Sequence, residues 1–207
     1  MIPRFPVYIF DVDGTLLDSA ADICGAIRDV LSATPRHDVS DAFLRRYIGR
    51  HLTDLFQDLS FQDGEIEGLI QSYREIYRGR GHRQTSVYPG VAEALVALGG
   101  RKSTATTKQT ATTRTVLELF GLLPFFEHVQ GTDGFPSKPA PDVILKTVEV
   151  FGVSPQECLM VGDSAADMEA GRRAGMKTCA VRYGYGTEAD LARWSPDYWV
   201  GDLRELA

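Results

Sequence analysis

Short apolar runs alternate with amphipathic segments along the C-terminal two thirds of the chain. The run at 158–161 is short and uniformly apolar, which is typical of a strand buried in a sheet. In other segments apolar residues recur every three or four positions, as at 141–152, where Pro141 and Gly152 provide typical start and stop signals of a helix. The alternation predicts a parallel sheet with helices on both faces. We expect strands at 7–10, 103–106, 128–131, 158–161, 177–181 and 197–200, and helices at 91–98, 113–121, 141–152, 166–175 and 187–194.

Residues 17–83 lack this alternation. Four stretches there have helical spacing, and no part of the region reads as a strand; the stretches are 20–33, 39–49, 51–59 and 64–81. This pattern predicts a helical cap at 17–83, inserted directly after the first strand, with 1–16 and 84–207 forming the core. The expected fold class is α/β, with a doubly wound parallel sheet in a Rossmann-like core and a small inserted α-helical cap domain.

Composition and charge exclude several classes of protein. The 207 residues suffice for one domain with an insertion, and 43% hydrophobic and 24% charged residues are ordinary for a globular protein. The net charge of −6 gives no electrostatic reason to bind nucleic acid or an anionic membrane. The chain has no apolar run long enough to span a membrane and no signal-peptide pattern, so we expect a cytoplasmic protein. The three cysteines form no metal or disulfide pattern.

Two aspartates, Asp11 and Asp13, directly follow the apolar run at 7–10. Side chains two residues apart on a strand share one face, so these carboxylates converge if the extended geometry continues, and Gly14 lets the chain turn away. Two close carboxylates repel each other unless a cation lies between them or one keeps a proton, and Mg²⁺ prefers oxygen ligands of this kind. The same residues also fit a simple strand end followed by an Asp-Gly turn.

More polar residues fall near the expected carboxyl ends of other strands, which is where ligands bind in open α/β sheets. One strand ends in Thr106, Thr107 and Lys108, and another ends in Asp163. Asp167 begins the following helix, and Lys138 lies in a proline-rich loop. Taken one at a time, these residues also have purely structural interpretations. The threonines and Asp163 could cap helices, Asp167 could be an acidic residue in the first turn of a helix, and Lys138 could be a solvated surface lysine. Their occurrence together at one edge of the sheet favours a functional site.

Four stretches together resemble the motifs of the haloacid dehalogenase-like hydrolase superfamily. They are "DVDGT" at 11–15, "TTK" at 106–108, "SKPAP" at 137–141 and "GDSAAD" at 162–167. The likeness covers essentially the whole chain, and the helical insertion lies where one branch carries its cap. Longer stretches, such as "VGDSAADMEAGRRAGM", look most like phosphoglycolate phosphatases and their close relatives. The resemblance implies a magnesium-dependent phosphatase that hydrolyses a small, phosphoglycolate-like monoester through an aspartyl-phosphate intermediate.

The resemblance also implies roles for individual residues. Asp11 would attack phosphorus, and Asp13 would protonate the leaving alcohol and then activate water. Magnesium would be held by Asp11, the backbone carbonyl of Asp13, and Asp163, with Asp167 supporting the acidic site. The residues expected to bind the phosphoryl oxygens are Thr106, the backbone of Thr107, and Lys138. Charge considerations agree, because a phosphoryl group and an attacking carboxylate are both negative and need cations to meet.

Several residues distinguish this chain from related enzymes. Phosphatases of this branch usually carry Asn where Thr107 stands, so a side-chain contact is lost there although a backbone contact survives. Dehalogenases lack Asp13, and phosphonoacetaldehyde hydrolases use a cap lysine, whereas the first lysine here is Lys102. Ile23 and Leu52 stand where β-phosphoglucomutases carry His and Arg. A sugar-phosphate phosphatase, a β-phosphoglucomutase-like phosphotransferase and a noncatalytic binding protein on a phosphatase scaffold are the alternatives.

The cap is expected to select the substrate. Gly49 interrupts a helical pattern there, and Arg50 and His51 follow it, so we predict these two as specificity residues facing the site. The other cap arginines, Arg74 and Arg78 among them, are expected on solvated helix faces. We also expect hinges at 16–19 and 84–88, a small phosphate ester as partner, and a monomer or homodimer.

Overall fold

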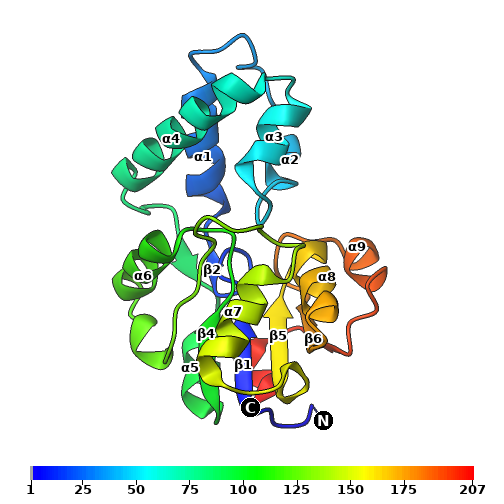
Figure 1. The fold of residues 1–207 in the computed structure, drawn as a ribbon. Coiled ribbons are helices and arrows are strands. Elements are labelled where there is room, and N and C mark those ends of the chain that lie inside the picture. Colours follow the sequence, from blue (N-terminus) through cyan, green and yellow to red (C-terminus); the bar gives the residue numbers. More distant parts are fainter. Residues whose placement is uncertain (1) are drawn as a thin grey trace.

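A five-stranded parallel sheet forms the centre of the protein, as described by a computed structural model for residues 2–207 (Figure 1). The strand order is β4-β1-β5-β6-β7, with β1 Val7–Phe10, β4 Arg101–Thr104, β5 Cys158–Gly162, β6 Lys177–Val181 and β7 Tyr198–Val200. β1 lies between β4 and β5, and the register places Phe10 level with Thr104 and Val161. The predicted parallel sheet is confirmed, and the carboxyl ends of these strands reach the same edge.

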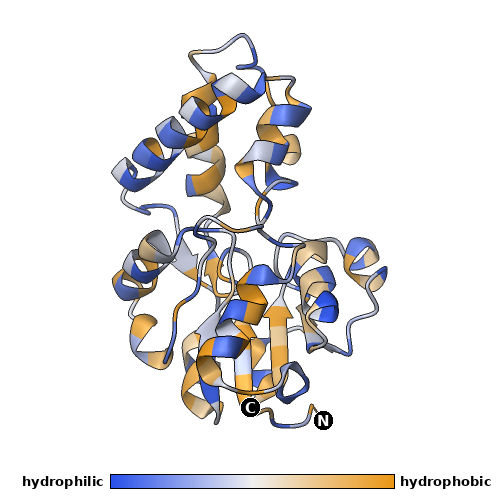
Figure 2. Ribbon diagram, in the orientation of Figure 1, coloured by the Kyte–Doolittle hydropathy of each residue, from blue (hydrophilic) through white to orange (hydrophobic). Residues whose placement is uncertain are grey.

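Helices cover both faces of the sheet, because successive side chains of each strand point to opposite sides. In β1, Tyr8 and Phe10 pack with residues of α5 and α6, while Val7 and Ile9 pack with residues of α7 on the other face. The helices of this region are α5 Val91–Ala97, α6 Thr110–Leu119, α7 Asp142–Phe151, α8 Ala165–Arg173 and α9 Glu188–Ala192, with 3₁₀ turns at Leu123–Phe125, Pro155–Glu157 and Leu203–Leu206. The doubly wound α/β fold is therefore as predicted, and Figure 2 shows the apolar character of its buried strand β5.

Two of the expected strands differ in the structure. β4 ends at Thr104 rather than at residue 106, although the amide of Ala105 still donates to Phe10 O across 2.9 Å. Residues 128–131 form no strand: one backbone bond reaches β4, from the amide of His128 to Lys102 O across 3.4 Å, and the other contacts with β4 run through side chains. The hydroxyl of Thr104 donates to Gln130 O and accepts from Gln130 N, each across 3.0 Å. The segment thus lies beside β4 without extending the backbone ladder.

Residues 17–83, called the cap segment below, form a group of helices beyond the carboxyl edge of the sheet (Figure 1). The helices are α1 Ala20–Leu31, α2 Asp41–Arg45, α3 Leu52–Asp58 and α4 Asp63–Gly79. Their apolar faces pack on one another in a cluster of their own, which includes Ile27, Leu44, Phe56 and Ile70. Within residues 2–207, none of the helices combines the length and apolar character needed to cross a membrane.

A two-stranded ribbon joins the cap segment to the rest of the protein. β2 (Leu17–Asp18) pairs antiparallel with β3 (Ser86–Val87), so Leu17 lies opposite Val87. The expectation that residues 17–83 contain no strand was wrong at Leu17 and Asp18, because two residues are too few to show an alternating pattern. The two linkers expected to act as hinges are paired with each other.

Candidate active site

Three aspartates meet at the carboxyl edge of the sheet, beneath the cap segment. Asp11 follows β1 and Asp163 follows the neighbouring strand β5, and the amide of Asp11 donates to Val161 O across 2.9 Å. Asp167 comes from the first turn of α8. Carboxylate oxygens of Asp11, Asp163 and Asp167 lie within 4.8 Å of one another, and all three residues are buried. The structure therefore brings these three predicted site residues together.

Gly14 permits this close approach. Its φ of +93° lies in the left-handed region that favours glycine, and a Cβ at this position would collide with the carboxylate of Asp163. The glycine of the "DVDGT" stretch therefore has a steric function as well as a conformational one. A larger residue here would displace Asp163 from the neighbourhood of Asp11.

Lys138 is the cation at the centre of the acidic group. Its Nζ donates to Asp11 Oδ1 across 2.8 Å and to Asp167 Oδ1 across 2.5 Å, and the lysine is only 2% exposed. Asp167 also accepts at Oδ2 from the amide and hydroxyl of Ser164, so it caps α8 while it holds Lys138. The capping role and the site role suggested by the sequence are thus combined in one carboxylate.

The acidic group carries more negative charge than Lys138 can balance. Burial raises the pKa of Asp11 to about 7, against the lowering effect of Lys138, and Asp167 adds to the rise. Burial likewise raises the pKa of Asp163 to about 8, with further contributions from Asp167 and Asp11. Asp11 and Asp163 thus hold protons up to the neutral range that a second cation would displace.

The donor set fits a hard divalent cation such as Mg²⁺. Asp11 Oδ2 is buried and has no hydrogen-bond partner within residues 2–207, so one oxygen of the expected nucleophile is open to a ligand. Asp163 is held in place by Thr15 Oγ1, which donates to Oδ1 across 3.0 Å, and by the amide of Tyr185, which donates to Oδ2 across 2.8 Å. Clustered carboxylate oxygens are the ligands that magnesium prefers.

The side chain of Asp13 points away from this cluster. Its Oδ1 accepts from the hydroxyl of Ser19 across 2.6 Å, and its Oδ2 forms an ion pair with Lys108 Nζ at 3.1 Å. Asp13 therefore offers no carboxylate oxygen to the group around Asp11, in keeping with the expectation that only its backbone carbonyl contributes there. The sequence analysis placed Lys108, the last residue of the "TTK" stretch, at this edge of the sheet but assigned it no role.

Lys108 connects the core to the cap segment. Its Nζ also donates to the hydroxyl of Tyr77 in α4 across 3.0 Å and lies 4.4 Å from the centre of the tyrosine ring. Burial lowers the pKa of Lys108, but Asp13 and Tyr77 outweigh that effect and raise it, so the amine stays protonated. The cation is therefore already engaged by Asp13 on one side and by the cap on the other.

Tyr185 forms a second connection, from a loop that the sequence analysis did not single out. Its hydroxyl accepts from the amides of Ser19 and Ala20 across 2.7 and 2.9 Å, at the start of α1, and donates to Asp18 across 2.9 Å. The hydroxyl of Ser19 is not available for this capping role because it is bound to Asp13. Tyr185 thus caps the first cap helix while its own amide holds Asp163.

The two predicted phosphate-binding threonines lie in the loop after β4. Thr106 is buried, and its Oγ1 accepts from the amide of Lys108 across 3.3 Å. Thr107 is half-buried and lines a cavity between this loop and the cap segment. Thr107 therefore faces the cap segment, whereas Thr106 lies buried in the same loop.

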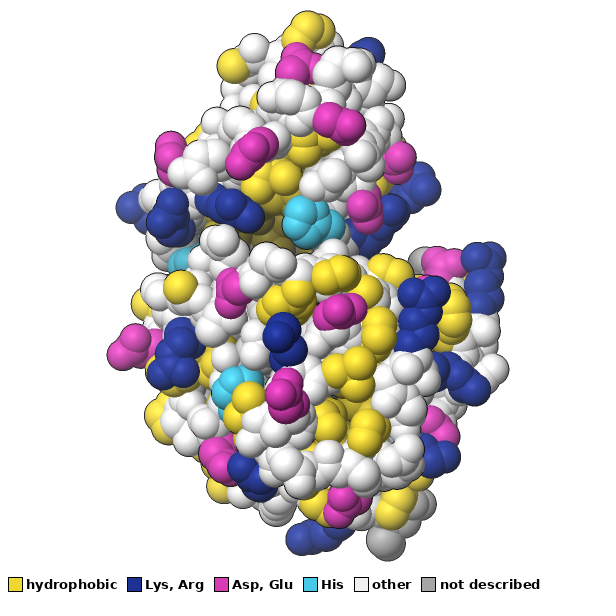
Figure 3. Space-filling view, in the orientation of Figure 1, with side chains coloured by type: hydrophobic (Ala, Val, Ile, Leu, Met, Phe, Trp, Pro, Cys, Tyr) yellow, Lys and Arg dark blue, Asp and Glu magenta, His cyan; other side chains and the backbone are white. Residues whose placement is uncertain are grey.

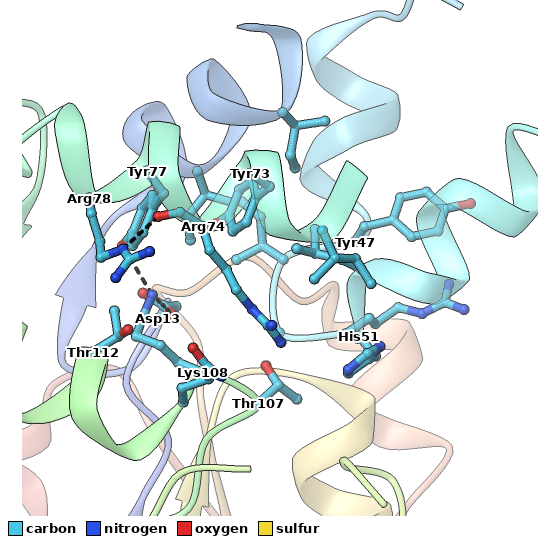
Figure 4. Close-up of a pocket in the computed structure, with 18 residues that line it drawn as sticks. Asp13, Tyr47, His51, Tyr73, Arg74, Tyr77, Arg78, Thr107, Lys108 and Thr112 are labelled. Carbon is cyan, nitrogen blue, oxygen red and sulfur yellow. Dashed lines mark hydrogen bonds and ion pairs between the residues drawn. The ribbon is translucent and has the colours of Figure 1, made fainter. Parts of the chain in front are cut away.

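The cavity next to Asp13 has a volume of about 100 Å³ (Figure 4). Core residues Asp13, Thr107 and Lys108 line its floor, and cap residues cover it, among them Tyr47, His51, Tyr73, Arg74 and Tyr77. A second, larger hollow of about 610 Å³ reaches Lys138 and Asp163 from the side of α8. Figure 3 shows basic and histidine side chains along the edge of the cap that faces the core.

Arg50 and His51, the predicted specificity residues, both line the cavity but are engaged within the cap segment. Arg50 forms an ion pair with Asp54 at 3.1 Å, and its guanidinium stacks 4.9 Å from the ring centre of Tyr47. His51 Nδ1 accepts from the amide of Thr53 as the N-cap of α3. Burial lowers the pKa of His51, so its ring is neutral at neutral pH.

Arg74 of α4 contradicts the expectation of a solvated helix face. Its side chain reaches down from the helix into the cavity, toward the loop that carries Thr107 and Lys108 (Figure 4). It is half-buried, and so is the neighbouring Tyr73. A signal was present in the sequence, because residues 70, 73, 74 and 77 have the spacing of one helix face.

Comparison with known proteins agrees with this geometry. Residues 8–181 match the family model described as haloacid dehalogenase-like hydrolase. The phosphoglycolate phosphatase of Aquifex aeolicus is 33% identical over 204 residues, which cover 97% of this chain and 94% of that protein. The phosphoglycolate phosphatase of Pseudomonas fluorescens is 30% identical, with 99% and 79% covered. The chain belongs to the haloacid dehalogenase-like hydrolase family and is a phosphoric monoester hydrolase.

Solved structures show the same fold over the full length. A haloacid dehalogenase-like family hydrolase from Streptococcus pneumoniae superposes with a TM-score of 0.90 at 25% identity, covering 98% of this chain and 96% of that one. A protein described as a predicted phosphoglycolate phosphatase from Haemophilus somnus gives a TM-score of 0.88 at 26% identity, with 100% and 98% covered. The α/β fold is therefore that of the family.

Proposed function

We propose that this enzyme is a magnesium-dependent phosphatase that hydrolyses a small phosphate monoester through an aspartyl-phosphate at Asp11. The observation that supports this most directly is the state of Asp11. One carboxylate oxygen is bound to the buried Lys138, and the other is buried without a partner beside Asp163. A nucleophile held this way keeps one oxygen fixed and the other available to a cation or to phosphorus.

The residues that would hold Mg²⁺ are Asp11, Asp163 and the backbone carbonyl of Asp13, with Asp167 beside them. When bound, the ion would balance the charge of the phosphoryl group and the carboxylates. Lys138 contributes a permanent positive charge at the same place, because Asp11 and Asp167 keep it protonated: burial lowers its pKa, and the two carboxylates more than reverse this. This arrangement allows an anionic carboxylate to approach an anionic phosphate.

Asp13 is the proposed general acid and base. In the first step a carboxylate oxygen of Asp11 attacks phosphorus, the ester P–O bond breaks, and Asp13 gives its proton to the departing alkoxide. In the second step Asp13 takes a proton from water, which attacks phosphorus and releases inorganic phosphate and Asp11. Ser19 and Lys108 fix the carboxylate of Asp13 on the cavity side, where the leaving group would lie.

The phosphoryl oxygens would be bound by Thr106, the backbone of Thr107, and Lys138. The cap segment, residues 17–83, would cover the site and exclude water during turnover. The names of the relatives and the small cavity beside Asp13 support a short carboxylated ester, such as phosphoglycolate, as the substrate class. Arg50 and His51 remain predicted contacts on the cap side.

Substitution of the nucleophile tests the proposal. Purified enzyme should hydrolyse p-nitrophenyl phosphate and phosphoglycolate only with added Mg²⁺, and beryllium fluoride should inhibit it by imitating the phosphorylated aspartate. Asp11→Asn should abolish turnover of both esters while circular dichroism shows an unchanged fold. Near-wild-type turnover by Asp11→Asn, or full activity after chelation, would overturn the mechanism.

A further inference from the structure

Resting on the proposed function, we infer that Arg74 binds a second anionic group of the substrate, a carboxylate a short carbon chain away from the reacting phosphate. The residue belongs to α4 of the cap segment and extends into the cavity toward Thr107 and Lys108 (Figure 4). The inference depends on what surrounds its guanidinium, on the charge balance of the cavity, and on the size of the space.

Arg74 is half-buried in the cavity lining and, within residues 2–207, has no anionic partner, unlike three other cap arginines. Arg78, which also lines the cavity without an ion pair in this range, is exposed, and its Nε donates to Arg74 O across 3.0 Å. Arg28 is paired with Asp41 at 2.6 Å, Arg80 with Asp29 at 2.7 Å, and Arg50 with Asp54 at 3.1 Å. Among residues 2–207, no carboxylate forms an ion pair with Arg74, and no hydrogen bond engages its guanidinium. A half-buried arginine that reaches into a cavity without a partner has its charge available to a ligand.

The cavity as a whole carries unbalanced positive charge near Arg74. Asp13 is the only acidic residue among those that line it, and Lys108 already forms an ion pair with that carboxylate. His51 is neutral because burial lowers its pKa, and Tyr73 and Tyr77 contribute aromatic surface to the lining without an opposing carboxylate. A ligand group placed against Arg74 is therefore favoured when it is anionic.

The location and size of the cavity define the ligand further. Asp13 lies in the cavity wall, so the leaving group of an ester attacked by Asp11 would project into this space. The volume of about 100 Å³ is well below the roughly 300–1,000 Å³ of pockets that hold drug-sized ligands. A chain of two or three carbons that ends in a carboxylate fits these limits, and the planar guanidinium of Arg74 suits bidentate binding of that carboxylate.

A matched pair of substrates isolates this contact. Phosphoglycolate and 2-hydroxyethyl phosphate have the same chain length, but only the first carries a carboxylate. Arg74→Ala should lower kcat/KM for phosphoglycolate about 10- to 100-fold and change that for 2-hydroxyethyl phosphate less than about threefold. Arg74→Lys should recover part of the loss. Arg28→Ala, which removes an arginine outside the cavity, should leave both values within about twofold.

A binding measurement makes the result independent of turnover. In the inactive Asp11→Asn background, calorimetry with phosphoglycolate should show weaker binding after Arg74→Ala by the same 10- to 100-fold, and no such change for 2-hydroxyethyl phosphate. Equal losses for both ligands, no loss for either, or a selective loss with Arg50→Ala in place of Arg74→Ala would overturn the inference. If the wild type hydrolyses neither ester but binds phosphoglycolate through Arg74, the proposed reaction fails while this contact stands.

Discussion

Removal of divalent cations above neutral pH should destabilise the folded enzyme, because the buried aspartates must then ionise close together. Burial raises the pKa of Asp11 to about 7 and that of Asp163 to about 8, from an ordinary value of 3.8. A carboxyl whose folded-state pKa is raised contributes stability that is complete below its unfolded pKa and is lost as pH rises through the folded pKa. The cation-free protein should therefore lose stability between about pH 6.5 and pH 8.5.

The expected loss follows from these two pKa values. One proton that the folded state still holds and the unfolded state has released lowers the free energy of unfolding by about 1.36 kcal/mol per pH unit. Over this interval Asp11 and Asp163 together give a loss of roughly 2–3 kcal/mol, most of it from Asp163, whose pKa is the higher. For a chain of 207 residues this corresponds to a Tm lower by roughly 5–10 °C.

The histidines change the stability in the opposite direction and mainly at lower pH. Burial lowers the pKa of His51, His82 and His128, and a lowered histidine pKa makes stability fall as pH decreases. Above about pH 7.5 these imidazoles are neutral in the unfolded chain as well, and between pH 6.5 and 7.5 each adds at most about 0.4 kcal/mol, which offsets part of the loss. The rest of the pH dependence of the free energy of unfolding comes from Asp11 and Asp163.

Urea unfolding monitored by the fluorescence of the two tryptophans is a suitable assay. It should be performed with EDTA and with saturating Mg²⁺ at each pH. Mg²⁺ should raise the free energy of unfolding and remove most of its pH dependence, because the folded carboxylates are then ionised throughout. Asp163→Asn should reduce the cation-free loss to less than half. A free energy that is constant or rises with pH in EDTA, or an equally steep loss in Asp163→Asn, would refute the reasoning.

Three other substitutions test single contacts of the site. Lys138→Met leaves Asp11 and Asp167 without their shared cation, so urea unfolding at neutral pH with EDTA should show a loss of about 3–5 kcal/mol, and an unchanged midpoint would contradict the buried ion pairs. Tyr185→Phe removes the hydroxyl that caps α1, and calorimetry should find Tm lower by roughly 3–10 °C, since such hydrogen bonds contribute about 1 kcal/mol each. Asp13→Asn should slow hydrolysis of an alkyl phosphate by about 10²- to 10⁴-fold and single-turnover release of p-nitrophenolate much less; equal losses would argue against an acid role.

The core of the site was predictable from the sequence because strand topology determines it. Residues that follow neighbouring parallel strands must meet at one edge, so Asp11 and Asp163 come together once the strands at 7–10 and 158–162 are recognised. The positions of Lys138 and Asp167 follow less directly from strand topology. Their loop and helix positions were expected near this edge, but the hydrogen bonds between them depend on side-chain packing that no periodicity encodes.

Contacts between distant loops were not predictable in the same way. The segment "RYGYG" has no apolar period, and nothing local indicates that the hydroxyl of Tyr185 reaches the start of α1, 166 residues away from Ser19. The pairing of β2 with β3 escaped prediction for a related reason, since each strand has only two residues. Such contacts exist only after the chain has folded back on itself, so a local pattern cannot show them.

The cap arginines show how far helical periodicity in the sequence can predict which side chains face the site. A helical period tells which residues share a face, and it placed Arg74 with Tyr73 and Tyr77, but it does not tell whether that face meets solvent or the core. The choice between Arg50 and Arg74 depends on a further fact, the position of the nearest carboxylate. Asp54 lies one helical turn after Arg50 and occupies its guanidinium, whereas the residue one turn after Arg74 is Arg78, which repels it. The i,i+4 neighbours therefore already favoured Arg74 over Arg50 as an arginine available to a ligand, and the direction of α4 had to come from the structure.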